Sequence, residues 1–191
     1  MAISPSTDGI DLLVAQHRAL EDLLDRTLEA TDPAQRRGLF RRVGDELSVH
    51  LGAEEQVFYP AVRARRTEDI LLESLEEHLS LKRLLADLLE IDPQERTFEP
   101  KFKVLREQTA HHHEEEEEHL FPKVRQLLSS EEIARIGAEM AALQTARRRD
   151  EDAPRESVVG ETGQAAELPP EVRSPALSPI TSDDPCRPLP D

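Results

Sequence analysis

Apolar side chains recur every three or four residues over most of positions 8–149, which is the spacing of amphipathic helices. This pattern predicts helices over 8–30, 32–66, 67–91, 99–128 and 129–149. Asp8 and Asp32 are suited to cap the first two, and Pro33 suits the first position inside a helix. Ser129 and Glu132 have the spacing of a capping box at the start of the fifth helix.

The first four predicted helices are long and their connections are short. We therefore predict an all-α protein built on an antiparallel four-helix bundle, with a short additional helix after it. Pro60 and Pro122 fall inside the second and fourth helices, but apolar positions continue past both. Since proline removes one backbone donor, we expect a kink at each rather than a helix end.

Residues 150–191 have a different composition from the rest of the chain. They hold eight of the fourteen prolines and ten acidic against three basic residues, with no aromatic residue. Such a segment cannot bury enough surface to offset its ordering entropy, so we predict a disordered acidic tail. The predicted division is a bundle at 8–128, an additional helix at 129–149 and the tail at 150–191. Cys186 lies in this tail and, as the single cysteine, cannot form an internal disulfide.

Charge and hydropathy limit the partners. The net charge of -16 argues against binding to nucleic acid or to an anionic membrane surface. No apolar run approaches the roughly 18 residues that a membrane span needs. The first residues also lack the basic and apolar regions of a secretory signal. We therefore expect a soluble, cytoplasmic protein, with the acidic tail as a surface for a protein partner.

The chain contains an internal repeat. The segment HLGAEEQVFYP (50–60) aligns with HHEEEEEHLFP (112–122), and HRALEDLLDRTLE (17–29) aligns with HLSLKRLLADLLE (78–90). The bundle is therefore expected to consist of two helical hairpins. Each hairpin has one histidine on its first helix and an HxxxE motif on its second.

The repeat places four histidines and two glutamates at matched depth on the inward faces of four helices. One such histidine alone would suit a hydrogen-bonded core position. Two buried carboxylates without partners, however, would cost several kcal/mol or become neutral, and a bound cation offsets that cost. The predicted metal ligands are His17, His50, Glu54, His78, His112 and Glu116. Glu55 and Glu117 are expected outside the ligands, and His113 and His119 are expected in outer or surface positions.

These motifs resemble the hemerythrin-like, HHE cation-binding family over residues 8–128. The resemblance implies a non-haem centre of two oxo-bridged irons. In that case the four predicted histidines are terminal ligands, and Glu54 and Glu116 bridge the two irons. The oxygen-carrying members have a further histidine one turn before His78, where this chain has Ser74. Either Glu21 or Glu77 could take the place of that histidine.

The departure at Ser74 leaves several functions open. The first is reaction with, or sensing of, oxygen, peroxide or nitric oxide, including a catalase-like activity. Reversible oxygen carriage is an alternative. A ferritin-like di-iron carboxylate site would need two Glu-x-x-His pairs, and only Glu116 and His119 form one, because Val57 occupies the repeated position. A helical interaction or regulatory module without metal is the remaining alternative.

Overall fold

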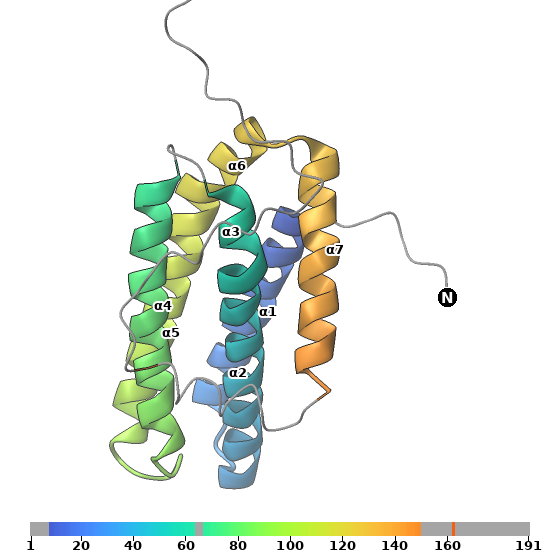
Figure 1. Cartoon of the computed structure of the whole chain (residues 1–191). Coiled ribbons are helices and arrows are strands. Elements are labelled where there is room, and N and C mark those ends of the chain that lie inside the picture. Colours follow the sequence, from blue (N-terminus) through green and yellow to red (C-terminus); the bar gives the residue numbers. More distant parts are fainter. Residues whose placement is uncertain (1–7, 64–66, 150–161, 163–191) are drawn as a thin grey trace, which may run out of the picture.

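The computed structural model describes residues 8–63, 67–149 and 162, and its helices run along one another in a bundle (Figure 1). In chain order they are α1 (Gly9–Glu29), α2 (Pro33–Ala53), η1 (Glu54–Phe58), α3 (Tyr59–Val62), α4 (Glu68–Leu89), α5 (Phe98–Glu115), η2 (Glu116–Leu120), α6 (Phe121–Leu127) and α7 (Ser130–Arg147). The described part of the chain contains no strand. The prediction of an all-α bundle with an additional helix is confirmed.

The predicted caps are present. The carboxylate of Asp8 accepts a hydrogen bond from the backbone N–H of Asp11, and that of Asp32 accepts one from Gln35. Ser129 opens α7 with a complete capping box. The predicted disordered tail and Cys186 lie outside the described residues, apart from residue 162.

Both HxxxE motifs run into a short π-helical turn, η1 or η2. The backbone N–H of Tyr59 bonds to the carbonyl of Glu54 five residues back, and that of Phe121 bonds likewise to Glu116. Pro60 follows the first of these turns and Pro122 the second. A proline lacks the N–H donor and presses on the carbonyl four residues back, and a widened turn accommodates it. The helices continue to Val62 and Leu127, which confirms that neither proline ends its helix.

The core consists of two apolar clusters. One lies towards the end of the bundle that contains the α1–α2 and α4–α5 connections, and its large members include Leu24, Leu47, Leu85, Phe98 and Phe102. The other lies towards the opposite end. Its members include Leu13, Phe58, Leu71, Val124 and Met140.

A polar layer separates the two clusters. On α1, for example, His17 falls between Leu13 of one cluster and Leu20 of the other. The histidines and glutamates of this layer are therefore screened from water on both sides, which makes their unpaired polar atoms costly.

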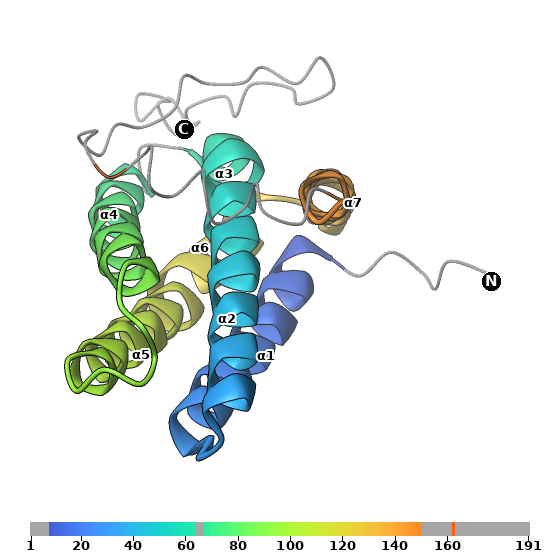
Figure 2. The ribbon, with the colours of Figure 1, turned by 90° about the horizontal axis from the view of Figure 1, so that it is seen from below.

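Helix α7 packs beside α1 and α2 on the outside of the bundle (Figures 1 and 2). Its Ile133, Ile136 and Met140 join the second apolar cluster. A Cβ atom on Gly9 would lie 3.1 Å from the backbone nitrogen of Gly137, so a larger residue would have to push α1 and α7 slightly apart. None of the described helices is long and apolar enough to cross a membrane, and the cytoplasmic location stays a prediction.

Candidate metal centre

The six predicted ligands meet in the polar layer. His17 comes from α1, His78 from α4, and the two HxxxE motifs from the α2–η1 and α5–η2 junctions. All six side chains are buried, with exposed fractions of 0–2%. Their coming together follows from the repeat, because equal depths on four antiparallel helices fall in one layer. Their role as ligands stays a prediction.

Each glutamate lies between histidines of the two hairpins. An Oε2 atom of Glu54 is 3.4 Å from Nε2 of His50 and 3.4 Å from Nε2 of His78. The corresponding atom of Glu116 is 3.4 Å from Nε2 of His17 and 3.8 Å from Nε2 of His112. Both carboxylates thus occupy positions from which they can bridge two metal ions.

The structure places His113 inside the bundle and not on its surface. This residue was expected to be an outer or surface group, but only 1% of it is exposed. Its ring stacks on His17 with centroids 3.9 Å apart. One ring nitrogen from each of His17, His50 and His113 lies within 4.8 Å of the other two, a spacing that could hold a metal ion. The repeat could not reveal His113, because its partner in the first hairpin is Leu51.

Tyr59 is a second group that the sequence patterns did not single out as a ligand. Its buried hydroxyl donates to Oε1 of Glu116 at 2.9 Å and lies 3.0 Å from Nε2 of His78. Ser74, the position of the absent histidine, hydrogen-bonds to the same phenol. Burial and the two neighbouring glutamates raise the pKa of Tyr59 well above its usual value. The phenol therefore lies between Ser74 and the polar groups of the centre. The sequence feature that could have marked Tyr59 is the Tyr59-Pro60 pair, which aligns in the repeat with Phe121-Pro122.

Five histidines present Nε2 to the centre and use Nδ1 for an outer partner. The Nδ1 distances are 2.8 Å for His17 to Glu117, 3.1 Å for His50 to Gln16, 2.9 Å for His78 to Glu55, 2.9 Å for His112 to Glu77 and 3.2 Å for His113 to Glu21. Such partners fix the tautomer with the Nε2 lone pair directed inward.

These contacts place four acidic residues at the outer nitrogens of the histidines. Glu55 and Glu117 lie outside the ligand groups, as expected from the sequence. Glu21 and Glu77, the two residues considered as replacements for the absent histidine, instead hold His113 and His112 by their outer nitrogens.

This geometry offers two neighbouring candidate positions for a metal ion. One is bounded by His17, His50 and His113, and the other by His78, His112 and the hydroxyl of Tyr59. Glu54 and Glu116 lie between them. The donor set of imidazoles and carboxylates suits iron, manganese or zinc.

Orphaned polar atoms show that these residues fit a bound cation. Seven buried side-chain nitrogen or oxygen atoms lack a hydrogen-bond partner among the described residues, and six belong to this centre. They are Nε2 of His17, His50 and His113, both carboxylate oxygens of Glu54, and Oε2 of Glu116. Buried polar atoms in native proteins are almost always paired, so the convergence of six orphans indicates a missing positive partner.

The electrostatics point the same way. Burial and the adjacent Glu116 carboxylate raise the pKa of Glu54 well above its usual value. Burial also lowers the pKa of His50, and the neighbouring imidazoles lower it further. Burial and the neighbouring His17 also lower the pKa of His113. Neutral imidazoles are the form that binds metal, and a cation would relieve the repulsion between the carboxylates.

A helical bundle with converging histidines and glutamates in its interior is a helical metal-binding protein. The family model of the hemerythrin HHE cation-binding domain matches residues 8–124, and the chain belongs to that family. The crystal structure of a hemerythrin HHE cation-binding domain-containing protein from Mycobacterium kansasii is similar in fold, with a TM-score of 0.67 at 22% identity. That similarity covers 84% of this chain and 96% of the other.

A DNA nickase of Nostoc sp. is 29% identical over 132 residues. This match covers 69% of the present chain but only 38% of the nickase. The ferritin-like alternative fails on geometry, since 53% of the His119 side chain is exposed and it pairs with Glu115 rather than joining Glu116.

Proposed function

We propose that this protein binds two iron ions and consumes hydrogen peroxide, oxygen or nitric oxide rather than carrying oxygen reversibly. The observation that carries the proposal is the convergence of six orphaned polar atoms, from three histidines and two glutamates, in one buried layer. The ligand chemistry permits several metals, and membership of the hemerythrin family favours iron. Bound iron would supply the electrons for reaction with these small molecules.

The protein side chains would set the charge and geometry of the pair. As metal ligands, neutral imidazoles would add no charge, whereas the carboxylates of Glu54 and Glu116 would offset the positive charge of the metal ions. The outer partners on Nδ1 hold each ring in one orientation, so the site is organised before a metal arrives. The apolar clusters on either side exclude bulk water from the layer.

The preference for consumption over carriage now rests on Tyr59. Five imidazoles, His113 among them, face the candidate metal positions. The remaining position without an imidazole lies beside the hydroxyl of Tyr59. This hydroxyl keeps its proton because its pKa is raised, and it can donate a hydrogen bond that assists breakdown of a bound oxygen species.

Metal analysis of protein purified without a histidine tag tests the first half of the proposal. We expect about two irons per chain, one for each candidate position. The double variant Glu54→Ala, Glu116→Ala should lose most of the iron. His119→Ala is the matched control, because it removes an exposed histidine from the same helical segment. Full iron occupancy in the double variant would refute the assignment.

Stopped-flow spectroscopy tests the second half. Reduced protein is mixed with oxygen, and oxidised protein is mixed with hydrogen peroxide. We expect rapid oxidation in the first experiment and peroxide turnover in the second. A long-lived oxygenated species that releases oxygen under vacuum, without peroxide turnover, would identify a carrier instead.

The similarity to a DNA nickase does not lead us to propose nickase activity. The match leaves most of that protein uncovered. The net charge of -16 also opposes binding to a polyanion.

A further inference from the structure

Gln16 on α1 and Gln144 on α7 form a reciprocal amide pair. Nε2 of Gln16 donates to Oε1 of Gln144 at 2.8 Å, and Nε2 of Gln144 donates to Oε1 of Gln16 at 3.0 Å. Gln144 is 2% exposed, so its amide depends on this partner. The pair joins α7, which follows the family-matched segment 8–124, to the bundle.

The same Oε1 atom of Gln16 lies 3.1 Å from Nδ1 of His50. An oxygen in that place accepts the Nδ1 proton and leaves the Nε2 lone pair for a metal. If Gln16 alone rotated by half a turn, its N–H group would face Nδ1 of His50. The same rotation would set like groups of Gln16 and Gln144 against each other. The amide pair therefore opposes rotation of Gln16 alone, and its Oε1 stays on Nδ1 of His50 unless both amides turn together.

The second hairpin explains why only His50 needs this support. Gln16 corresponds in the repeat to Glu77, which accepts from Nδ1 of His112 at 2.9 Å. A carboxylate accepts through either oxygen, so its rotation does not matter. An amide accepts through one atom only and needs a neighbour that fixes it. The neutral Gln16 thus creates the requirement that Gln144 meets.

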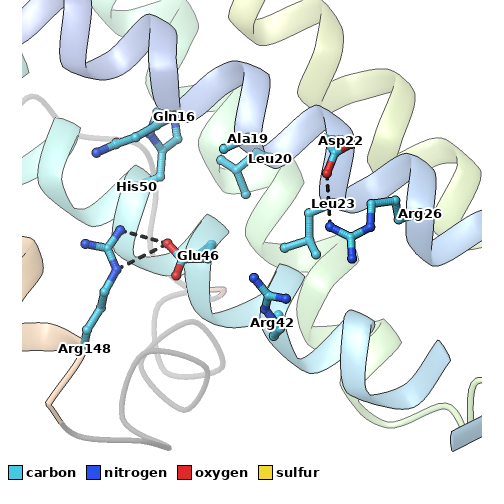
Figure 3. A pocket seen from close by; sticks show the side chains of 10 residues that line it. All are labelled: Gln16, Ala19, Leu20, Asp22, Leu23, Arg26, Arg42, Glu46, His50 and Arg148. Carbon is cyan, nitrogen blue, oxygen red and sulfur yellow. Dashed lines mark hydrogen bonds and ion pairs between the residues drawn. The ribbon is translucent and has the colours of Figure 1, made fainter. Parts of the chain in front are cut away.

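A cavity of about 340 Å³ adjoins this network between α1, α2 and α7 (Figure 3). Gln16 and His50 lie at one end of it, and Glu46 and Arg148 pair beside them. A mobile Gln16 would therefore leave the outer edge of the His50 ring open to water in this cavity. Water there can compete for the Nδ1 proton and loosen the ring.

We infer that Gln144 is a positioning residue of the metal centre, acting on the His50 ligand through Gln16. Helix α7 is then part of the site and not only a covering helix. The inference rests on the proposed metal function. Removing this outer support should speed metal loss about tenfold, the lower end of the effect of outer partners in metal sites.

The test uses zinc-loaded full-length protein, because zinc is diamagnetic. Three proteins are compared: wild type, Gln144→Leu, and Gln144→Leu with Gln16→Glu. The rate of zinc loss to a chelator is measured, and nitrogen-15 NMR of the histidine rings reports the protonation of Nδ1. We expect faster loss and an altered His50 signal in Gln144→Leu, with the His112 signal unchanged. Gln16→Glu should restore both, because a carboxylate supports His50 without α7.

Equal zinc retention in all three proteins would overturn the inference. So would faster loss that Gln16→Glu does not restore, because that result would assign the effect to α7 packing. Zinc binding by the wild type separates these outcomes from failure of the proposed function. If the single variant does not fold, folding and normal zinc retention of the double variant still support the inference, and their absence contradicts it.

Discussion

Replacing Glu54 with leucine should change stability in opposite directions with and without metal. Both carboxylate oxygens of Glu54 are buried without a hydrogen-bond partner. In the metal-free protein this side chain is a buried polar group that nothing satisfies. Leucine has a similar volume and lies naturally against the apolar clusters on either side. The substitution should therefore stabilise the metal-free fold.

The size of each effect can be estimated. A buried unsatisfied polar group costs about 1–3 kcal/mol, which for a domain of this size corresponds to roughly 3–9 °C in Tm. With free metal at a hundred times Kd, binding adds about 2.7 kcal/mol per site. A hundredfold loss of affinity reduces that to about 0.4 kcal/mol. Since Glu54 lies between both positions, the loss over two sites is about 4–5 kcal/mol and exceeds the gain.

Thermal unfolding followed by circular dichroism measures both states. Wild type and Glu54→Leu are compared after chelation, and again with ferrous iron under anaerobic conditions. The variant should melt above wild type without metal and below it with metal. Glu118→Leu, an exposed acid in the neighbouring η2 turn, is the control and should move both melting temperatures little. A lower melting temperature for metal-free Glu54→Leu would refute the argument that Glu54 is held at a cost for binding.

Three further predictions concern the phenol, the close contact of α7 and a helix cap. Tyr59→Phe should keep the iron content but slow peroxide consumption about a hundredfold, because it removes one proton donor. An oxygen electrode measures the rate of peroxide consumption, and an unchanged rate would exclude this role for Tyr59. Gly9→Ala should lower Tm, because its Cβ would press on the α7 backbone. Gly38→Ala, whose Cβ would have no atom within 4 Å, should stabilise the protein by about 0.5–1 kcal/mol. Calorimetry measures both, and equal shifts in Tm for the two variants would contradict the packing argument. Burial opposes ionisation of Asp8, but a backbone N–H and Arg125 outweigh burial and lower the pKa of this carboxyl. The charged Asp8 therefore stabilises the fold at neutral pH, and this stabilisation is lost as the pH falls through the folded pKa. In urea titrations, Asp8→Asn should be up to about 1 kcal/mol less stable than wild type at pH 7 and equally stable at pH 2.5, and a constant difference would contradict the charge argument.

The sequence predicted the bundle and its polar layer because both depend on periodicity. Apolar positions at helical spacing define inward faces, and a repeat at equal depth brings His17, His50, His78 and His112 into one layer. Helix ends were less well predicted: the second helix was expected to reach residue 66, but Arg63 is already extended. The π turns were not predicted, since they arise from a compromise between the prolines and the continuing helix.

The missed site residues are those that break the repeat. His113 aligns with Leu51 and Tyr59 with Phe121, so comparison of the two hairpins could not mark either as a ligand. The position of Tyr59, which directly follows η1, depends on how the helix is rotated at that π turn, because an extra residue in a turn shifts which side chains face inward. Periodicity that assumes a regular helix places such residues wrongly by a fraction of a turn. Gln144 was missed for a different reason, because α7 has no counterpart within the repeat.

The three departures from symmetry make the two metal positions chemically different. At one position, His17 and His113 have carboxylate partners and His50 has a neutral amide. At the other, His78 and His112 have carboxylate partners and the third group is the phenol of Tyr59. Each position thus has two imidazoles held by carboxylates, and the two differ in the third group, an amide-supported imidazole or a protonated phenol. Because the phenol can donate a hydrogen bond to a bound oxygen species, peroxide consumption is expected at the second position.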